Sequence, residues 1–144
     1  MTRVDFYLLE DVDLYARQRF ACRLAYRAVC GGQEVYIHNA QKDDCLALDE
    51  LMWAYPEHQF LPHALIEDNK QENAPVKIGW QEPLSDQDQV LINLSREVPK
   101  FFGRFERVAE IIVRDIRDEG RDRYKYYRDC GYPLHHHELN DWEQ

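Results

Sequence analysis

Short runs of strand-forming residues alternate with longer segments of helical periodicity in the first half of the chain, and this alternation limits the folds open to it. The run VDFYLL at 4–9 is rich in β-branched, aromatic and aliphatic residues and ends at acidic, turn-forming residues, which is typical of a buried strand. Asp11 and Asp13 offer N-caps for a helix over 14–29, and Gly31 and Gly32 supply a stop signal. Together these segments predict one β-α step.

The β-α step repeats in the next segment of the chain. EVYIHN at 34–39 alternates like a strand, and Asn39 can cap a helix over 41–54. QFLPH at 59–63 follows, but Pro62 lacks a backbone donor and restricts the residue before it. We therefore expect only a brief or edge strand there.

The rest of the chain continues the alternation. Its expected segments are a polar loop at 66–74, strands at 76–80, 90–94 and 107–113, a short helix at 98–105 and a last helix at 115–129. Alternating strands and helices predict an α/β fold with a mostly parallel sheet flanked by helices on both faces. We expect a single Rossmann-like, mononucleotide-binding-like domain over 1–134, followed by a polar, His-rich C-terminal tail over 135–144.

Composition narrows the class of protein. A chain of 144 residues with 44% hydrophobic residues is long enough for one packed domain. Its four cysteines are widely scattered, and its first residues lack the regions of a signal peptide. The longest apolar runs are far shorter than the roughly 18–20 residues of a membrane helix. These features predict a soluble, cytoplasmic protein with no membrane contact.

The Rossmann-like pattern raises the question of a nucleotide, but the phosphate-binding fingerprints are missing. None of the six glycines forms G-x-G-x-x-G or G-x-x-x-x-G-K-[ST], and the turn after the first strand is EDVD, whose carboxylates would repel a phosphate. No nucleophile signature surrounds any Ser or Cys. We expect no nucleotide site, no cofactor and no catalytic residues. The alternative, an enzyme with a Rossmann-like fold, is supported by fold analogy alone.

The histidines at 135–137, with Glu138 and Asp141, form the one cluster that suggests a metal. A metal site needs rigid, convergent ligands, and no Cys pair at zinc spacing supports it. We interpret these residues as a solvated tail and expect no metal.

The stretch GRDRYKYYRDCGY at 120–132 is unexpectedly basic for a chain of net charge -9. On a helix, Arg121, Tyr124, Lys125 and Arg128 stand at i, i+3, i+4 and i+7, so three cations share one face with a tyrosine. The alternative is a solvated helix whose aspartates pair with these cations. The scarcity of acids after residue 120 favours a site for an anionic peptide or a terminal carboxylate.

A second cluster lies in LDELMWAYPEHQFLPHAL at 48–65. Trp53, Phe60, Pro62 and Leu65 concentrate apolar surface on a connection of the kind that usually lies at the surface. The residues either pack into the core beneath the preceding helix or form an exposed aromatic-proline patch suited to a stable partner.

Several of these pieces occur together in one known family. FYLL, LDELMW followed by FLPHAL, APVKIGW, LINL, FFGRFERV and RDRYKYYRDCGYPL stand in an order and spacing that resembles the chi subunit of bacterial DNA polymerase III holoenzyme over nearly the whole chain. The ending HHHELNDWEQ is not part of that pattern.

The resemblance implies a non-catalytic accessory subunit of DNA replication, with a nucleotide-binding-like fold but no nucleotide. It implies a heterodimer with the psi subunit, which tethers it to the clamp loader, and binding to the acidic C-terminal tail of single-stranded-DNA-binding protein. The implied tail-binding residues are Arg121, Tyr124, Lys125, Arg128 and Ile112, and the implied psi-binding residues are Trp53, Phe60, Pro62 and Leu65.

A second hypothesis is a module that binds single-stranded nucleic acid directly. Tyr124, Tyr126 and Tyr127 would then stack on bases between the cations. Net charge opposes this reading, because such binding depends on cationic side chains that displace counterions from phosphates. We expect contact with DNA only indirectly, through the protein partners.

Overall fold

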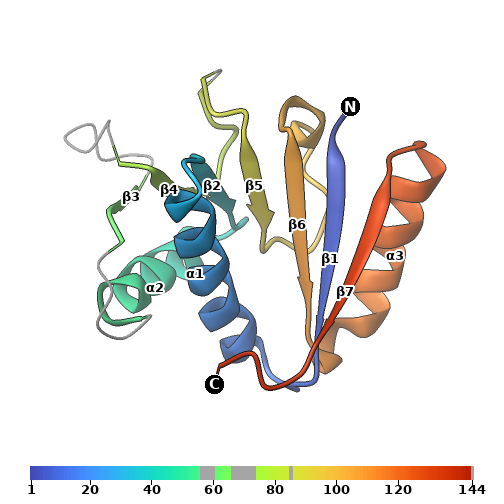
Figure 1. The fold of residues 1–144 in the computed structure, drawn as a ribbon, viewed down its shortest axis with the longest axis horizontal. Helices are drawn as coiled ribbons and strands as arrows, with labels where there is room; N and C mark the ends of the chain where they lie inside the picture. The colour runs from blue at the N-terminus through green and yellow to red at the C-terminus, as the bar shows by residue number, and fades with distance from the viewer. Residues whose placement is uncertain (56–60, 66–73, 85, 144) are drawn as a thin grey trace.

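The computed structural model describes residues 1–55, 61–65, 74–84 and 86–143. In these residues a single seven-stranded sheet has the order β3-β4-β2-β5-β6-β1-β7, and every pair of neighbouring strands is parallel. The strands are β1 (Arg3–Leu9), β2 (Val35–His38), β3 (His63–Leu65), β4 (Val76–Gly79), β5 (Val90–Asn93), β6 (Arg107–Ile112) and β7 (Leu134–Leu139). The expected Rossmann-like α/β class is confirmed (Figure 1).

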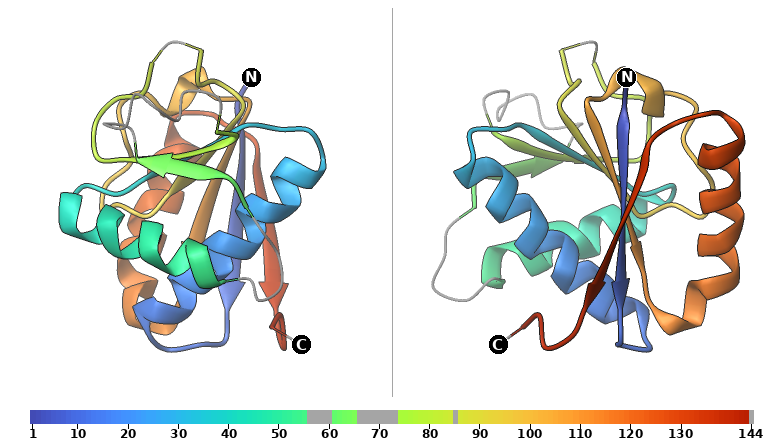
Figure 2. Two further views of the ribbon diagram at one scale, coloured as in Figure 1. Left: turned by 90° about the vertical axis from the view of Figure 1, so that its left-hand side faces the viewer. Right: turned by 45° about the vertical axis from the view of Figure 1, so that its right-hand side comes forward.

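Helices cover both faces of the sheet. The helices α1 (Leu14–Cys30) and α2 (Lys42–Ala54) lie on one face, and α3 (Arg117–Asp129) lies on the other (Figure 2). The chain moves from β1 through α1 toward β2, but from β6 through α3 in the opposite direction to β7. Because crossovers between parallel strands are right-handed, opposite directions place the helices on opposite faces.

Local sequence signals account for some helix ends and miss others. The Asp13 carboxylate accepts a hydrogen bond from the Ala16 amide at 3.1 Å, and Gly32 after α1 has a φ of 83°. Asn39 does not cap α2, which starts after Gln41 without a side-chain cap. The short helix expected at 98–105 is reduced to a 3₁₀ turn at Phe102–Arg104.

The region expected as a brief strand at 59–63 is shifted along the chain. The structure has β3 at His63–Leu65, three residues that pair with β4 at the edge of the sheet. Positions 59 and 60 of the expected strand lie outside the described residues. Pro62 stands just before the strand, where its missing N–H costs no ladder hydrogen bond.

The polar tail expected from residue 135 is wrong for its first part. Leu134–Leu139 form β7, which pairs in parallel with β1 from Val4↔Leu134 to Leu9↔Leu139. A polar strand is stable there because it lies at the edge of the sheet, where one side remains in water. Tertiary pairing with the buried strand β1 therefore overrides the polar composition of the segment.

The last residues after β7 pack against α1. The Trp142 indole donates to the Asp11 carboxylate at 2.8 Å, and its ring meets Phe20 edge-on at 5.2 Å. Arg19 donates two hydrogen bonds of 2.9 Å to Glu143. These contacts fix the C-terminal segment on the helix rather than leaving it solvated.

The loops after β1 and β6 are tied together at the edge of the sheet where the strands end. The amides of Arg114 and Asp115 donate to the carbonyls of Asp11 and Val12, each at 3.1 Å. Close by, the buried Arg17 guanidinium donates to three strand-end carbonyls. Burial lowers the pKa of Arg17 to about 10, against the opposing charge of Glu110, so the side chain stays cationic at neutral pH.

Within the described ranges, no helix combines the length and apolar character that crossing a membrane requires.

Candidate peptide-binding groove

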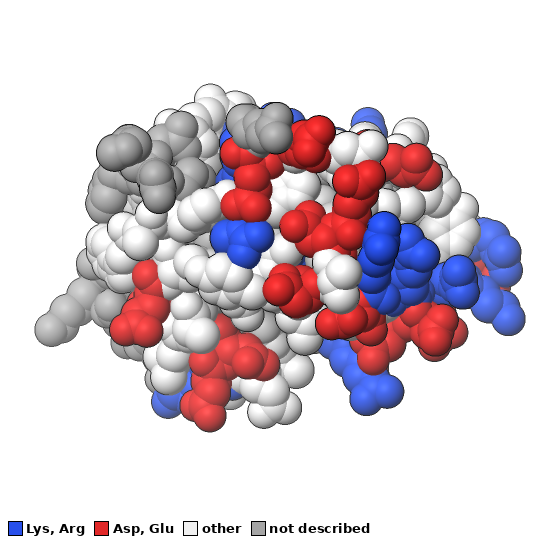
Figure 3. Space-filling view, turned by 90° about the horizontal axis from the view of Figure 1, so that it is seen from below, with Lys and Arg blue, Asp and Glu red and all other residues white. Residues whose placement is uncertain are grey.

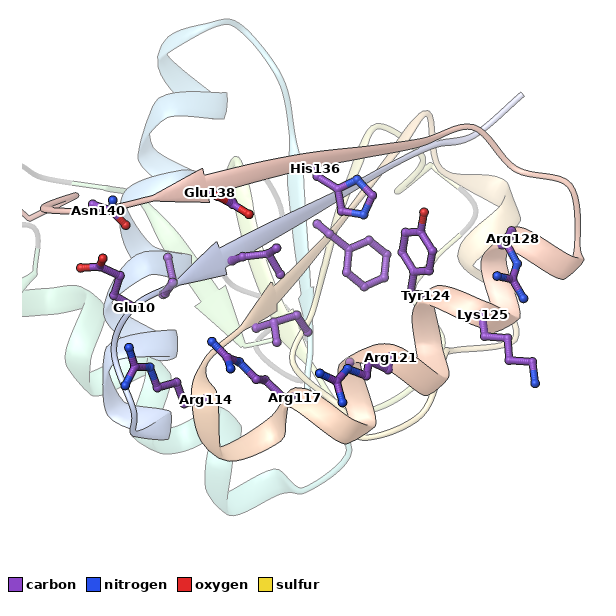
Figure 4. Close-up of a pocket in the computed structure, with 15 residues that line it drawn as sticks. Glu10, Arg114, Arg117, Arg121, Tyr124, Lys125, Arg128, His136, Glu138 and Asn140 are labelled. Carbon is purple, nitrogen blue, oxygen red and sulfur yellow. The ribbon is translucent and has the colours of Figure 1, made fainter.

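A groove of about 780 Å³ runs between α3 and the β1–β7 edge of the sheet. We call it the α3 groove. Helix α3, the strands β1, β6 and β7 and the loops at their ends all contribute to it (Figure 4). Its lining residues are Phe6, Leu8, Leu9, Glu10, Ile112, Arg114, Arg117, Gly120, Arg121, Tyr124, Lys125, Arg128, His136, Glu138 and Asn140.

The floor of the α3 groove is apolar. Side chains of β1 and of Ile112 at the end of β6 form it, and Ile112 is almost fully buried. Gly120 brings α3 unusually close to this floor, because a Cβ built on Gly120 would lie 2.8 Å from the Ile112 Cδ1 atom. A glycine is therefore required at this contact if Ile112 is to keep its position.

One wall of the α3 groove is cationic. Arg117, Arg121, Lys125 and Arg128 extend along α3, and Arg114 precedes the helix. Seen from the edge where the strands end, Lys and Arg gather beside α3 whereas Asp and Glu cover much of the remaining face (Figure 3).

The aspartates near this wall leave its cations largely in water. The guanidinium of Arg121 lies 3.5 Å from Asp118, but the two side chains are 77% and 96% exposed. Arg128 lies 3.3 Å from Asp129 in a similarly open pair. Exposed pairs of this kind contribute only about 0–1 kcal/mol and break readily, so the cations remain available to another anion.

Tyr124 links the cationic wall to the sheet. Its ring meets Phe6 of β1 edge-on at 5.3 Å and lies 5.0 Å from the ring of His136 on β7. Tyr124 is half-buried, and its side chain points from α3 toward β7, beside His136 (Figure 4). The five residues expected to form one tail-binding site, Arg121, Tyr124, Lys125, Arg128 and Ile112, therefore line one groove.

The side of the α3 groove that lies opposite α3 carries acidic and polar residues. Glu10, Glu138 and Asn140 line that side, across from Arg114 and Arg117 and away from Lys125 and Arg128 (Figure 4). The groove is thus cationic along α3 and acidic on the opposite side, which favours an anionic ligand that lies along α3.

The buried face of α3 carries a charge network that the sequence analysis did not identify. Arg123 Nε donates to the Glu110 carboxylate at 2.8 Å, and both side chains are buried. Glu110 also accepts hydrogen bonds from the Tyr127 hydroxyl at 2.7 Å and the Asn93 amide at 2.8 Å. Burial, followed by the neighbouring Glu110 charge, raises the pKa of Tyr127.

This network changes the interpretation of the basic stretch. Arg123 holds α3 on the sheet and does not join the exposed cations. Tyr127 is fully buried, and Tyr126 is 50% exposed and packs near Phe102. The three tyrosines do not form one exposed stacking platform, because only Tyr124 and Tyr126 reach the surface.

The second predicted cluster lies near the end of α2 and is partly exposed. The Trp53 side chain is 62% exposed and its ring lies 4.6 Å from that of His63. Pro62 is exposed, whereas Leu65 is half-buried against the core. Phe60 lies outside the described residues. The exposed Trp53 and Pro62 fit a partner surface, and Leu65 shows that the cluster also continues into the core.

The His triplet does not converge on one point. Strand alternation places His136 beside Phe6 on the α3 face and His137 against Tyr7 on the α1 face. In the part of the chain that the structure describes, no group of three or more His, Cys, Asp or Glu side chains is arranged to hold a metal ion.

The fold and the groove together define an α/β protein with a cationic surface groove. The family model described as DNA polymerase III chi subunit, HolC, matches residues 1–135. The DNA polymerase III subunit chi of Pseudomonas aeruginosa is 43% identical over 141 residues, covering 96% of this chain and 98% of that protein. The subunit chi of Escherichia coli is 32% identical over 141 residues, covering 93% and 96%, and that of Haemophilus influenzae is 30% identical over 133 residues, covering 90% and 92%.

The chain therefore belongs to the DNA polymerase III chi subunit family. This confirms the family resemblance of the sequence and supports an accessory role in DNA replication.

Proposed function

We propose that this protein is a non-catalytic subunit that joins two replication proteins through two separate surfaces. The α3 groove binds the acidic C-terminal tail of single-stranded-DNA-binding protein. The surface around Trp53 and Pro62 binds the psi subunit, and psi connects the protein to the clamp loader. Family membership supports this proposal, and so does the separation of the two surfaces on opposite faces of the sheet.

The observation that carries the tail-binding proposal is the combination of five cations and an apolar floor in one groove. Acidic side chains and a terminal carboxylate pair with the cations, while an apolar terminal residue packs against Ile112 and the β1 side chains. Each charged hydrogen bond contributes about 1.5–3 kcal/mol. A micromolar affinity, about -8 kcal/mol, needs only a few such bonds and one buried side chain.

Direct stacking of single-stranded DNA on α3 has less support. Tyr127 is inside the core, so the three tyrosines cannot stack on successive bases. Glu10 and Glu138, which line the side of the groove opposite α3, also repel a polyanion that extends along it. In this proposal the α3 groove reaches DNA only through its protein partner.

Reversing the charge of Arg121 tests the tail-binding proposal. We expect Arg121→Glu to weaken binding of a synthetic aspartate-rich peptide with an apolar C-terminal residue by about tenfold or more, since an attraction becomes a repulsion. Calorimetric titration at low salt measures the dissociation constant, and added salt should weaken binding by the intact protein.

Arg27→Glu is the matched control for this titration. Arg27 is exposed on α1, on the other face of the sheet, so its reversal changes net charge equally without touching the groove. Peptide binding that Arg121→Glu leaves unchanged, or that both variants weaken equally, contradicts the proposal.

Removing the Trp53 ring tests the psi surface. We expect Trp53→Ala to weaken the complex with psi by about tenfold or more, because large exposed aromatic residues dominate such interfaces. Surface plasmon resonance with immobilised psi measures the effect. Leu84→Ala is the control, since Leu84 is 68% exposed and lies between β4 and β5, outside the predicted psi-binding cluster. Equal affinities for intact protein and Trp53→Ala would place the psi surface elsewhere.

A further inference from the structure

A second groove, of about 610 Å³, lies on the other face of the β1–β7 edge. We call it the α1 groove. Helix α1 packs mainly over β2, β5 and β6, so β1 and β7 extend beyond the helix on this face. The groove is lined by Tyr7, Phe20, Arg23, Leu24, Tyr26, Arg27, Cys30, His137, Leu139, Asn140 and Trp142. None of the tail-binding or psi-binding residues belongs to it.

Aromatic rings form a continuous row in the α1 groove. His137 stacks on Tyr7 at 4.8 Å and an interplanar angle of 17°. Tyr7 contacts Phe20 at 5.4 Å, and Phe20 contacts Trp142 at 5.2 Å. Tyr7, His137 and Trp142 are each only half-buried, so the row reaches the surface.

Arginines border this row. Arg23 and Arg27 stand one turn apart on α1, and the Arg23 guanidinium lies 5.8 Å from the centre of the Trp142 ring. Burial and the charge of Asp5 raise the pKa of Tyr7, while Arg107, Arg3 and Arg27 oppose that rise. Three arginines from three different elements therefore act electrostatically on the same ring.

Two acidic side chains beside the α1 groove, Asp5 and Glu143, are paired with cations. Asp5 is buried and contacts Arg3, Arg107 and His137 at 3.1, 3.2 and 2.9 Å. Burial alone would raise the pKa of Asp5, but hydrogen bonds from His137 and Arg3 hold it below its usual value. At the other end, Arg19 binds Glu143. Arg23 and Arg27 therefore make the α1 side of the groove cationic on a chain of net charge -9, whereas acidic residues adjoin Trp142 at its end.

We propose that the α1 groove binds a short stretch of single-stranded nucleic acid. Bases pack against the exposed parts of Tyr7 and Trp142, and phosphates contact Arg23 and Arg27. Aromatic rings between cations are the combination that holds single strands without reading their sequence. An acidic peptide would use the cations but make less use of the exposed rings. The surrounding negative charge limits the contact to a few nucleotides and makes it sensitive to salt.

Fluorescence anisotropy with a labelled oligothymidylate of about 15 nucleotides tests the proposal at low salt. We expect the intact protein to bind, and Arg27→Glu to weaken binding by about tenfold or more, since a phosphate contact becomes a repulsion. Arg27→Gln should reduce the slope of log affinity against log salt by about one. Trp142→Ala should also weaken binding, whereas Trp142→Phe, which keeps an aromatic ring, should retain more of it. Thermal unfolding of each variant shows that it is folded.

Arg121→Glu is the control, because it reverses a charge in the α3 groove on the opposite face. It should leave oligonucleotide binding unchanged while it weakens binding of the acidic peptide. The two proposals, one for each groove, can therefore be contradicted independently. Absence of binding by the intact protein at low salt overturns the proposal. So does binding that depends on Arg121 and not on Arg27.

Discussion

Replacing Glu110 by alanine is expected to lower the free energy of unfolding by about 3–5 kcal/mol. The substitution leaves the Arg123 guanidinium buried without its carboxylate and removes the acceptor of the Tyr127 hydroxyl and the Asn93 amide. Losing one member of a buried charge pair is costly because the remaining charge stays out of water. Urea denaturation followed by circular dichroism measures the change.

Two controls separate this effect from loss of any carboxylate near α3. Glu119→Ala removes an acid that lies 3.7 Å from Arg96 in an exposed pair, and we expect a change of about 0–1 kcal/mol. Replacing Glu110 by leucine together with Arg123 by methionine removes both charges and should recover the part of the loss that comes from the unpaired charge, while the Tyr127 hydroxyl still lacks its acceptor. If Glu110→Ala and Glu119→Ala are equally stable, the buried network does not hold α3 in place.

Gly120→Val is expected to destabilise the protein by about 2–3 kcal/mol and to weaken peptide binding at the same time. A Cβ at position 120 would meet Ile112 at 2.8 Å, so either α3 or Ile112 must move. Either movement changes the floor of the α3 groove. Denaturation gives the stability, and titration with the acidic peptide gives the affinity.

Gly31→Ala is the comparison for this variant. At Gly31 the nearest atom to an added Cβ lies 3.4 Å away and φ is -84°, so an alanine fits without strain. We expect little change in stability or in peptide affinity. A Gly120→Val protein with unchanged stability and affinity would show that the close approach of α3 to β6 is not required.

Much of the fold follows from local patterns. The alternation of VDFYLL and EVYIHN with helical segments predicted the α/β class, and the Asp13 cap and the glycines after α1 predicted the ends of that helix. These signals are strong because each depends on residues close together in the chain. Asn39 and the segment 98–105 misled for the same reason, since packing, and not propensity, sets where those elements begin and end.

The candidate site was predictable in part. Helical spacing alone placed Arg121, Tyr124, Lys125 and Arg128 on one face, and the structure shows them lining one groove. The sequence analysis did not find Glu10, His136 or Glu138 as groove residues, because Glu10 follows β1 at the other end of the chain and the other two reach the groove only through the pairing of β7 with β1. Helical spacing also places Arg123 and Tyr127 on a different face from these cations, but no local pattern could show that both bond to the buried Glu110.

The amino-acid sequence by itself determined the α/β class, the cationic face of the last helix and the family, because periodicity, charge spacing and motif order are properties of neighbouring residues. Only the tertiary structure decided that LHHHEL at 134–139 is a strand and that Glu110 and Arg123 are buried partners. The physical reason is that strand pairing and charge burial depend on what a segment meets across the fold. The two grooves on either side of β7 exist because that polar segment pairs with β1.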